Sequence, residues 1–184
     1  MIQVRDAEPT DGPALADAHL EGWRVGYRGL VPDAYLDSAE FAANRRAIWD
    51  AWNWNERGGC VLFTVELDGS PVGFGLCGPE RVPSDEPGPL PTRDERGEVY
   101  SFYLHPRAWG TGAAAALMSR CESWLTAAGY ADAVLWVLRD NPRGRAFYEK
   151  AGWRTTGREM SFDLSVPDGT THPLHEVEYG NVLL

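Results

Sequence analysis

The stretch Arg107-Ala108-Trp109-Gly110-Thr111-Gly112 follows an apolar segment and precedes an alanine-rich one. Its two glycines lack a Cβ atom, so the backbone there can turn tightly and approach a ligand closely. The helix predicted to begin at Ala113 leaves its first N–H groups without helical partners and has a partial positive charge at that end. A diphosphate placed there satisfies those groups, and Arg107 can add a charge-assisted contact. The stretch therefore predicts a phosphate-binding turn between a strand and a helix.

Other interpretations of this turn stay open when the stretch is taken alone. Two glycines separated by one residue also occur in ordinary strand-to-helix turns. A Walker loop is excluded, because no Gly-Lys-Ser/Thr sequence follows. A dinucleotide-binding fingerprint fits poorly because it belongs early in a βαβ unit, although Ala115 is a tolerated variant of its third glycine.

The rest of the chain alternates between helical and extended patterns. The pair Asp68-Gly69 is a hairpin turn signal, and the five prolines within 79–97 predict a mobile loop. We predict helices at about 11–25, 33–36, 39–54, 113–128 and 142–151, and strands at 2–5, 60–67, 71–77, 98–104, 133–138, 153–166 and 175–183. This order predicts a mixed α/β sheet, and a chain of 184 residues is expected to form a single domain, 1–184.

Composition and charge narrow the classes of partner. The chain has 17 Lys and Arg and 27 Asp and Glu residues, which gives a formal net charge of −10. Such a surface repels nucleic acid and anionic membranes and favours a cationic substrate, although it also serves solubility alone. The three cysteines show no Cys-x-x-Cys spacing, and no segment resembles a signal peptide or reaches transmembrane length. We therefore expect a reduced, cytoplasmic protein without a membrane anchor.

A second motif, at residues 141–153, makes the interpretation of the first one more specific. Asn141-Pro142-Arg143-Gly144-Arg145-Ala146-Phe147-Tyr148-Glu149-Lys150-Ala151-Gly152-Trp153 follows the next predicted strand. Together the two motifs resemble the GNAT superfamily of N-acetyltransferases, whose signature is R/Q-x-x-G-x-G/A and, some thirty residues later, N-x-x-(A/G)-x-x-F-Y-x-x-x-G-(F/W). Residues 21–36 are also similar to a common bacterial branch of that family.

The resemblance implies a fold and a coenzyme site. The fold would be α/β (α+β): a mixed, mostly antiparallel sheet of six or seven strands, with helices on both faces and two splayed central strands. The pantetheine arm of acetyl-CoA would lie in the gap between those strands, where unpaired backbone groups need partners. One amide there, of Tyr103 or Leu104, would polarise the thioester carbonyl. Asn141 would bond the pantetheine, cap its own helix, or both. The coenzyme contacts implied are Tyr103, Leu104, Arg107, Trp109, Gly110, Thr111, Gly112, Ala113, Asn141 and Phe147.

The resemblance also implies two catalytic side chains. A free alkylammonium has a pKa of about 10, so a base must take its proton before it can attack. Glu98 matches the family's frequent base position; the alternative is a strand-end acid that faces solvent. Tyr148 matches the family's general acid, which protonates the departing thiolate; the alternative is a helix tyrosine that packs beside Phe147.

The acceptor pocket would be lined by aromatic side chains. Trp23 and Tyr27 are four residues apart and share a helix face, and Tyr100 shares a strand face with Glu98. Together with Trp136 they would attract a cationic amine through cation–π contacts, although any one aromatic of this kind is more often a core residue than a ligand contact.

The sequence thus predicts an acetyl-CoA-dependent N-acetyltransferase that acts on a primary amine of a small molecule by direct attack in a ternary complex. Two alternatives stay open: a peptide or protein N-acetyltransferase, and a catalytically idle acyl-CoA-binding sensor. The histidines and cysteines show no metal-ligand spacing, so no metal is expected. A homodimer through the last strands is common in the family and is an expectation for this chain.

Overall fold

The computed structural model describes residues 1–54, 58–82, 92–166 and 169–183. In this part of the chain seven strands form one sheet in the order β1-β2-β3-β4-β5-β7-β6. Their bounds are β1 (Ile2–Asp6), β2 (Val61–Leu67), β3 (Ser70–Arg81), β4 (Thr92–Leu104), β5 (Asp132–Leu138), β6 (Arg154–Ser165) and β7 (Thr171–Val182). Only β4 and β5 run parallel to each other, and every other neighbouring pair of these strands is antiparallel. The predicted mixed, mostly antiparallel sheet is confirmed.

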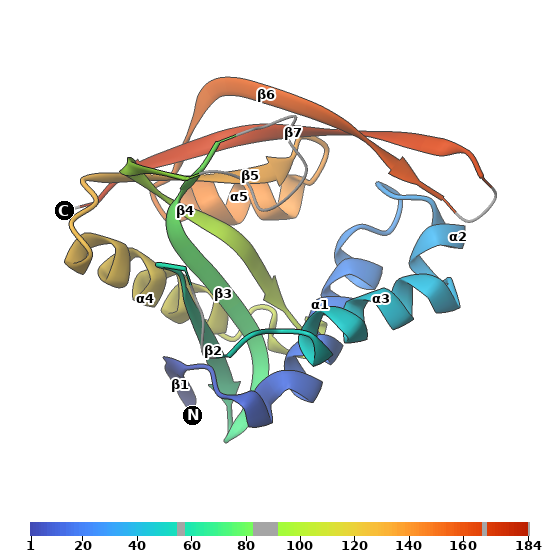
Figure 1. Cartoon of the computed structure of the whole chain (residues 1–184), viewed down its shortest axis with the longest axis horizontal. Coiled ribbons are helices and arrows are strands. Elements are labelled where there is room, and N and C mark those ends of the chain that lie inside the picture. The colour runs from blue at the N-terminus through green and yellow to red at the C-terminus, as the bar shows by residue number, and fades with distance from the viewer. Residues whose placement is uncertain (55–57, 83–91, 167–168, 184) are drawn as a thin grey trace.

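Helices cover both faces of the sheet (Figure 1). They are α1 (Gly12–Gly26), α2 (Asp33–Leu36), α3 (Ala39–Asp50), α4 (Ala113–Ala127) and α5 (Pro142–Lys150), with short 3-10 turns η1 (Pro9–Asp11) and η2 (Pro106–Ala108). The group α1–α3 lies at the right of Figure 1 and α4 at the left, with α5 beneath β5. Within the described ranges, no helix combines the length and hydrophobicity needed to cross a membrane.

Apolar side chains at helical spacing determine which face of each helix packs on the sheet. On α4 the residues Leu117, Cys121 and Leu125 are fully buried and lie on one helix face, which packs on β1–β4. On the opposite side of the sheet, α1 packs on β3 and β4. We call these two sides the α4 face and the α1 face. The loop between β2 and β3 is the predicted hairpin, since Asp68 and Gly69 both have positive φ, as a type I′ turn requires.

The central strands separate partway along their length. The parallel pairing of β4 with β5 covers only Gly97–Val99 opposite Ala133–Leu135. At that point the register of β3 against β4 shifts, because Leu76 pairs with Ser101 while Cys77 pairs with Val99. The extra residue is Tyr100, and such a bulge bends the strand that contains it. Beyond the bulge β4 turns away from β5 (Figure 1), which confirms the predicted splay.

The predicted bounds of a loop and of a helix were wrong. The predicted loop over 79–97 is shorter at both ends, because β3 continues to Arg81 and β4 already begins at Thr92. Prolines and acids suggested a loop, but buried ion pairs of Glu80 and Glu98 stabilise these strand ends. The remainder of that predicted loop, 83–91, lies outside the described residues. The helix predicted over 39–54 ends at Asp50.

Candidate active site

A cavity of about 250 Å³ lies where β4 and β5 separate. Helix α1 contributes to its wall from one face of the sheet, and α4 and α5 contribute from the other. Nine of the predicted site residues line it: Tyr27, Tyr100, Tyr103, Leu104, Trp109, Trp136, Asn141, Phe147 and Tyr148. The cavity therefore passes between the splayed strands and connects the α1 face to the start of α4.

The predicted phosphate turn has the required backbone conformation. Gly110 and Gly112 have φ of 76° and 96°, values in the left-handed region that favours glycine. Gly112 is the N-cap of α4, so the positive end of that helix faces the turn. The hydroxyl of Thr111 donates to the carbonyl of Ala108 over 2.7 Å and accepts from the amide of Ala113 over 3.3 Å. The Thr111 side chain thus stabilises the turn, and diphosphate binding there stays a prediction.

Trp109 and Arg143 join this turn to the cavity. The indole N–H of Trp109 donates to the carbonyl of Leu104 over 3.3 Å. The guanidinium of Arg143 lies 3.9 Å from the centre of the Trp109 ring, within cation–π range. Sequence reasoning missed Arg143, although it stands inside the second motif and lines the cavity. The predicted phosphate ligand Arg107 instead donates to the carbonyl of Pro71 over 3.3 Å, and its contact with a phosphate stays a prediction.

Asn141 caps helix α5. Its side-chain oxygen accepts the amide N–H of Gly144 over 3.0 Å, which satisfies one of the free donors of the first turn. A Cβ atom at Gly144 would lie 2.8 Å from the Asn141 side chain and 3.2 Å from Val137, so glycine allows α5 to pack closely on β5. The capping role is therefore confirmed, and since Asn141 also lines the cavity, a contact with pantetheine stays a prediction.

Tyr148 lies in the wall of the cavity. Only 9% of the residue is exposed, and its ring packs among those of Phe102, Phe147 and Tyr179 at centroid distances of 5.3–6.4 Å. Burial raises the pKa of its phenol above the ordinary value of 10, and the nearby titratable groups Tyr103, Cys121 and Glu176 add to the effect. The hydroxyl therefore keeps its proton at neutral pH, as a general acid must.

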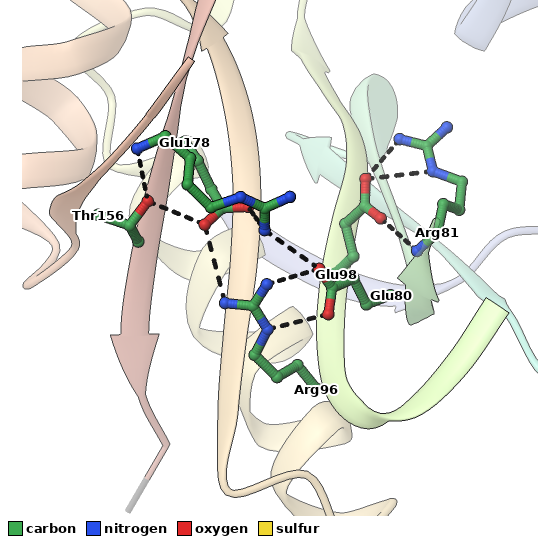
Figure 2. A network of polar contacts seen from close by, with 7 residues as sticks. Glu80, Arg81, Arg96, Glu98, Thr156 and Glu178 are labelled. Atoms are coloured by element: carbon green, nitrogen blue, oxygen red, sulfur yellow. Dashed lines mark hydrogen bonds and ion pairs between the residues drawn. The ribbon is translucent and has the colours of Figure 1, made fainter. Parts of the chain in front are cut away.

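Glu98 is buried and ion-paired. Its side chain is 2% exposed, so the alternative of a solvent-facing strand-end acid is wrong. One oxygen accepts from the Arg81 guanidinium over 3.1 and 2.5 Å, and the other accepts the Arg81 backbone N–H over 2.7 Å (Figure 2). Glu98 is not among the residues that line the cavity in the described part of the chain. It is held by Arg81, whose guanidinium also lies 4.4 Å from the Tyr100 ring centre.

The aromatic residues of the α1 face form a connected group. The Tyr27 and Tyr103 hydroxyls are 3.5 Å apart, and the Trp23 ring packs against both side chains. Arg45 lies over the Trp23 ring at 4.4 Å, so Trp23 is enclosed behind Tyr27, outside the cavity lining. Tyr100 donates its hydroxyl proton to the carbonyl of Pro79. The structure thus brings Tyr27, Tyr100 and Trp136 to the cavity and places Trp23 in the packing behind it.

Comparisons with known proteins agree with this geometry. Residues 28–153 match the model of the acetyltransferase (GNAT) family. The uncharacterized N-acetyltransferase YuaI of Bacillus subtilis is 30% identical over 142 residues, which cover 77% of this chain and 75% of YuaI.

Solved structures have the same fold. An N-acetyltransferase from Staphylococcus aureus Mu50 superposes with a TM-score of 0.69 and 21% identity over 100% of this chain and 99% of that one. The protein YncA from Salmonella typhimurium, solved with acetyl-CoA, superposes with a TM-score of 0.63 and 20% identity over 100% of this chain and 94% of that one. Since the family model covers both motifs and the fold is shared, the chain belongs to the GNAT family of acetyltransferases and is an N-acetyltransferase.

Proposed function

We propose that the protein transfers the acetyl group of acetyl-CoA to a primary amine of a small molecule, by direct attack in a ternary complex. The observation that carries this proposal is the cavity between the splayed strands, which is lined by residues from elements on both faces of the sheet. The donor would enter from the phosphate turn on the α4 face and the acceptor from the α1 face. A cavity of about 250 Å³ is slightly smaller than the usual range for small-molecule sites, about 300–1,000 Å³, which supports a small acceptor.

The residues around the cavity suit the steps of acetyl transfer. One backbone amide on the part of β4 that does not pair with β5, of Tyr103 or Leu104, would bind the thioester carbonyl and stabilise its negative charge. Tyr148 would protonate the thiolate when the C–S bond breaks. The assignment of Glu98 as the base stays a prediction. To accept a proton, Glu98 would have to give up a hydrogen bond with Arg81.

An amine panel tests this function. The protein is mixed with acetyl-CoA and, in turn, cadaverine, spermidine, tyramine, lysine methyl ester and an alanine-initiated tetrapeptide, and release of the coenzyme thiol is measured. We expect release with at least one of the four small amines. Release with the tetrapeptide alone would favour a peptide acetyltransferase, whereas coenzyme binding without release in any mixture would indicate an idle sensor. Repeating the active mixture with propionyl-CoA and succinyl-CoA measures acyl selectivity.

Replacement of one turn glycine should weaken coenzyme binding. Gly112→Ala places a Cβ atom on a residue with φ of 96°, a conformation that costs about 1–2 kcal/mol for an L-residue. The turn is expected to relax away from its ligand-binding shape, so the Kd of coenzyme A measured by calorimetry should rise about tenfold. Gly129→Ala is the matched control, since Gly129 has φ of 97° but follows the other end of α4. An equal loss of affinity in both variants would argue against a phosphate role for the turn.

A further inference from the structure

Glu176 lies on the α1 face of the sheet. In the antiparallel register of β7 against β5, Glu176 is opposite Leu138 and Glu178 is opposite Trp136. Directly opposed residues share a face, and residues two apart on a strand do too. Leu174, the next residue of β7 on the same face, packs in the apolar cluster that α1, α2 and α3 cover. Glu176 is therefore two residues along β7 from Glu178, which is opposite Trp136. Trp136 lines the cavity, whereas Glu176, like Glu98, is not itself among the lining residues in the described part of the chain.

The other buried glutamates of this region all have arginine partners (Figure 2). Glu80 pairs with Arg96 at 2.5 Å, Glu98 with Arg81 at 2.5 Å, and Glu178 with Arg158 at 2.8 Å. Among the residues that the structure describes, no hydrogen bond or ion pair reaches the carboxylate of Glu176. Its cross-strand neighbours Leu138 and Met160 carry no charge.

This carboxylate lies in an environment that favours binding a cation. The residue is half-buried, and burial is the main cause that raises the pKa of its carboxyl group; the charge of Glu98 adds to the effect and Arg81 opposes it. The titratable groups that interact electrostatically with the Glu176 carboxylate are Tyr27, Tyr103, Tyr148, Arg81 and Glu98. Three of these are phenols, and all three line the cavity. A partly desolvated carboxylate without a hydrogen bond or ion pair is costly, and a bound ammonium would reduce that cost.

We propose that Glu176 is the carboxylate that binds the ammonium of the acceptor and accepts its first proton. The proposal rests on the proposed function and deepens it by naming the group that selects a cationic amine. Proton transfer leaves a neutral amine, whose lone pair attacks the thioester carbon as the C–N bond forms. The C–S bond then breaks, and the thiolate takes the Tyr148 proton. The second ammonium proton returns to Tyr148, and the proton on Glu176 leaves to solvent.

Paired glutamate variants test the assignment. The most active amine of the panel is used with wild type, Glu176→Gln, Glu98→Gln and Glu159→Gln across pH 5.5–9.5. We expect Glu176→Gln to lower kcat/KM at neutral pH by about 10²-fold, within the range for a positioned base, and to flatten the acid limb of the pH profile. Glu98→Gln should keep that limb. Glu159→Gln, an exposed residue of β6 with the same change of charge, should behave as wild type.

Binding gives a second readout that does not depend on turnover. The trimethyl derivative of the same amine, in which every primary nitrogen is trimethylated and any secondary one is dimethylated, keeps the positive charge but cannot be acetylated. Its inhibition constant should rise at least tenfold in Glu176→Gln, whereas that of the neutral alcohol analogue should not change. The Kd of coenzyme A, measured on every variant, controls for folding.

Each outcome decides the question. An acid limb that persists in Glu176→Gln and disappears in Glu98→Gln would overturn the inference and assign the base to Glu98. Unchanged inhibition by the trimethyl derivative would remove Glu176 from the acceptor site. If wild type releases thiol and only the variants contradict the expectation, the proposed function stands. If wild type releases none with any amine, the function fails and the inference fails with it.

Discussion

Tyr148→Phe should lower kcat by about 10²- to 10⁴-fold, the contribution typical of a positioned general acid. The phenyl ring of the variant can keep the contacts with Phe102 and Phe147, so the cavity wall is preserved. What is lost is the proton that the thiolate needs when it leaves. The Kd of coenzyme A should change little, because Tyr148 is not part of the turn predicted to bind the diphosphate. Steady-state kinetics with the panel's best amine and calorimetry with coenzyme A measure the two effects.

The raised pKa of Tyr148 also predicts how kcat depends on pH. An acid must be protonated to act, so activity is lost as the pH rises through its pKa in the folded protein. Burial raises that pKa above the ordinary value of 10, so Tyr148 should cause no decline in kcat up to pH 9.5.

A neighbouring tyrosine provides the matched control. The Tyr179 hydroxyl donates to Glu149 over 2.8 Å and accepts from Arg145 over 3.0 Å, and its ring lies 6.2 Å from that of Tyr148. Tyr179→Phe removes these structural hydrogen bonds, so it should cost about 1 kcal/mol of stability and leave kcat near wild type. Equal kcat values for Tyr148→Phe and wild type would remove the phenol from the mechanism.

The parts of the site that come from local sequence were predictable. The local sequence determines the backbone conformation of both motifs. The turn 107–112 has glycines that can adopt left-handed φ values, and the segment 141–153 begins with a helix cap followed by proline. The splay of the central strands followed from the resemblance, and the structure adds its local cause, the bulge at Tyr100.

The parts that depend on pairing between distant strands were not predictable. Glu98 meets Arg81 because β3 continues to Arg81 and pairs with β4, with a second shift of register between Pro79 and Glu80. Glu176 reaches the α1 face beside β5 because β7 inserts between β5 and β6, out of chain order. Composition and periodicity describe each strand alone and contain no information on either register.

Trp153→Ala is expected to cause the largest loss of stability, about 3–5 kcal/mol, as for other buried tryptophans. Trp153 ends the second motif, and none of its surface is exposed. Its indole N–H donates to Glu122 of α4 over 2.8 Å, and the same carboxylate oxygen accepts from Asn181 of β7 over 3.2 Å. Through Glu122, the Trp153 side chain thus connects the segment after α5 to α4 and to the last strand. Removing it leaves a cavity and also frees a hydrogen-bond acceptor.

Trp153→Phe separates these two effects. The phenyl ring keeps much of the apolar volume but cannot donate to Glu122, so this variant should lose about 1–2 kcal/mol, mainly from the missing hydrogen bond. Denaturant unfolding of wild type and both variants measures the difference. Both variants, kept well below their unfolding midpoints, should bind coenzyme A as wild type does, because Trp153 does not line the cavity. A stable Trp153→Ala with weak coenzyme binding would reverse this assignment, since the motif's last residue would then act on the ligand and not on the fold.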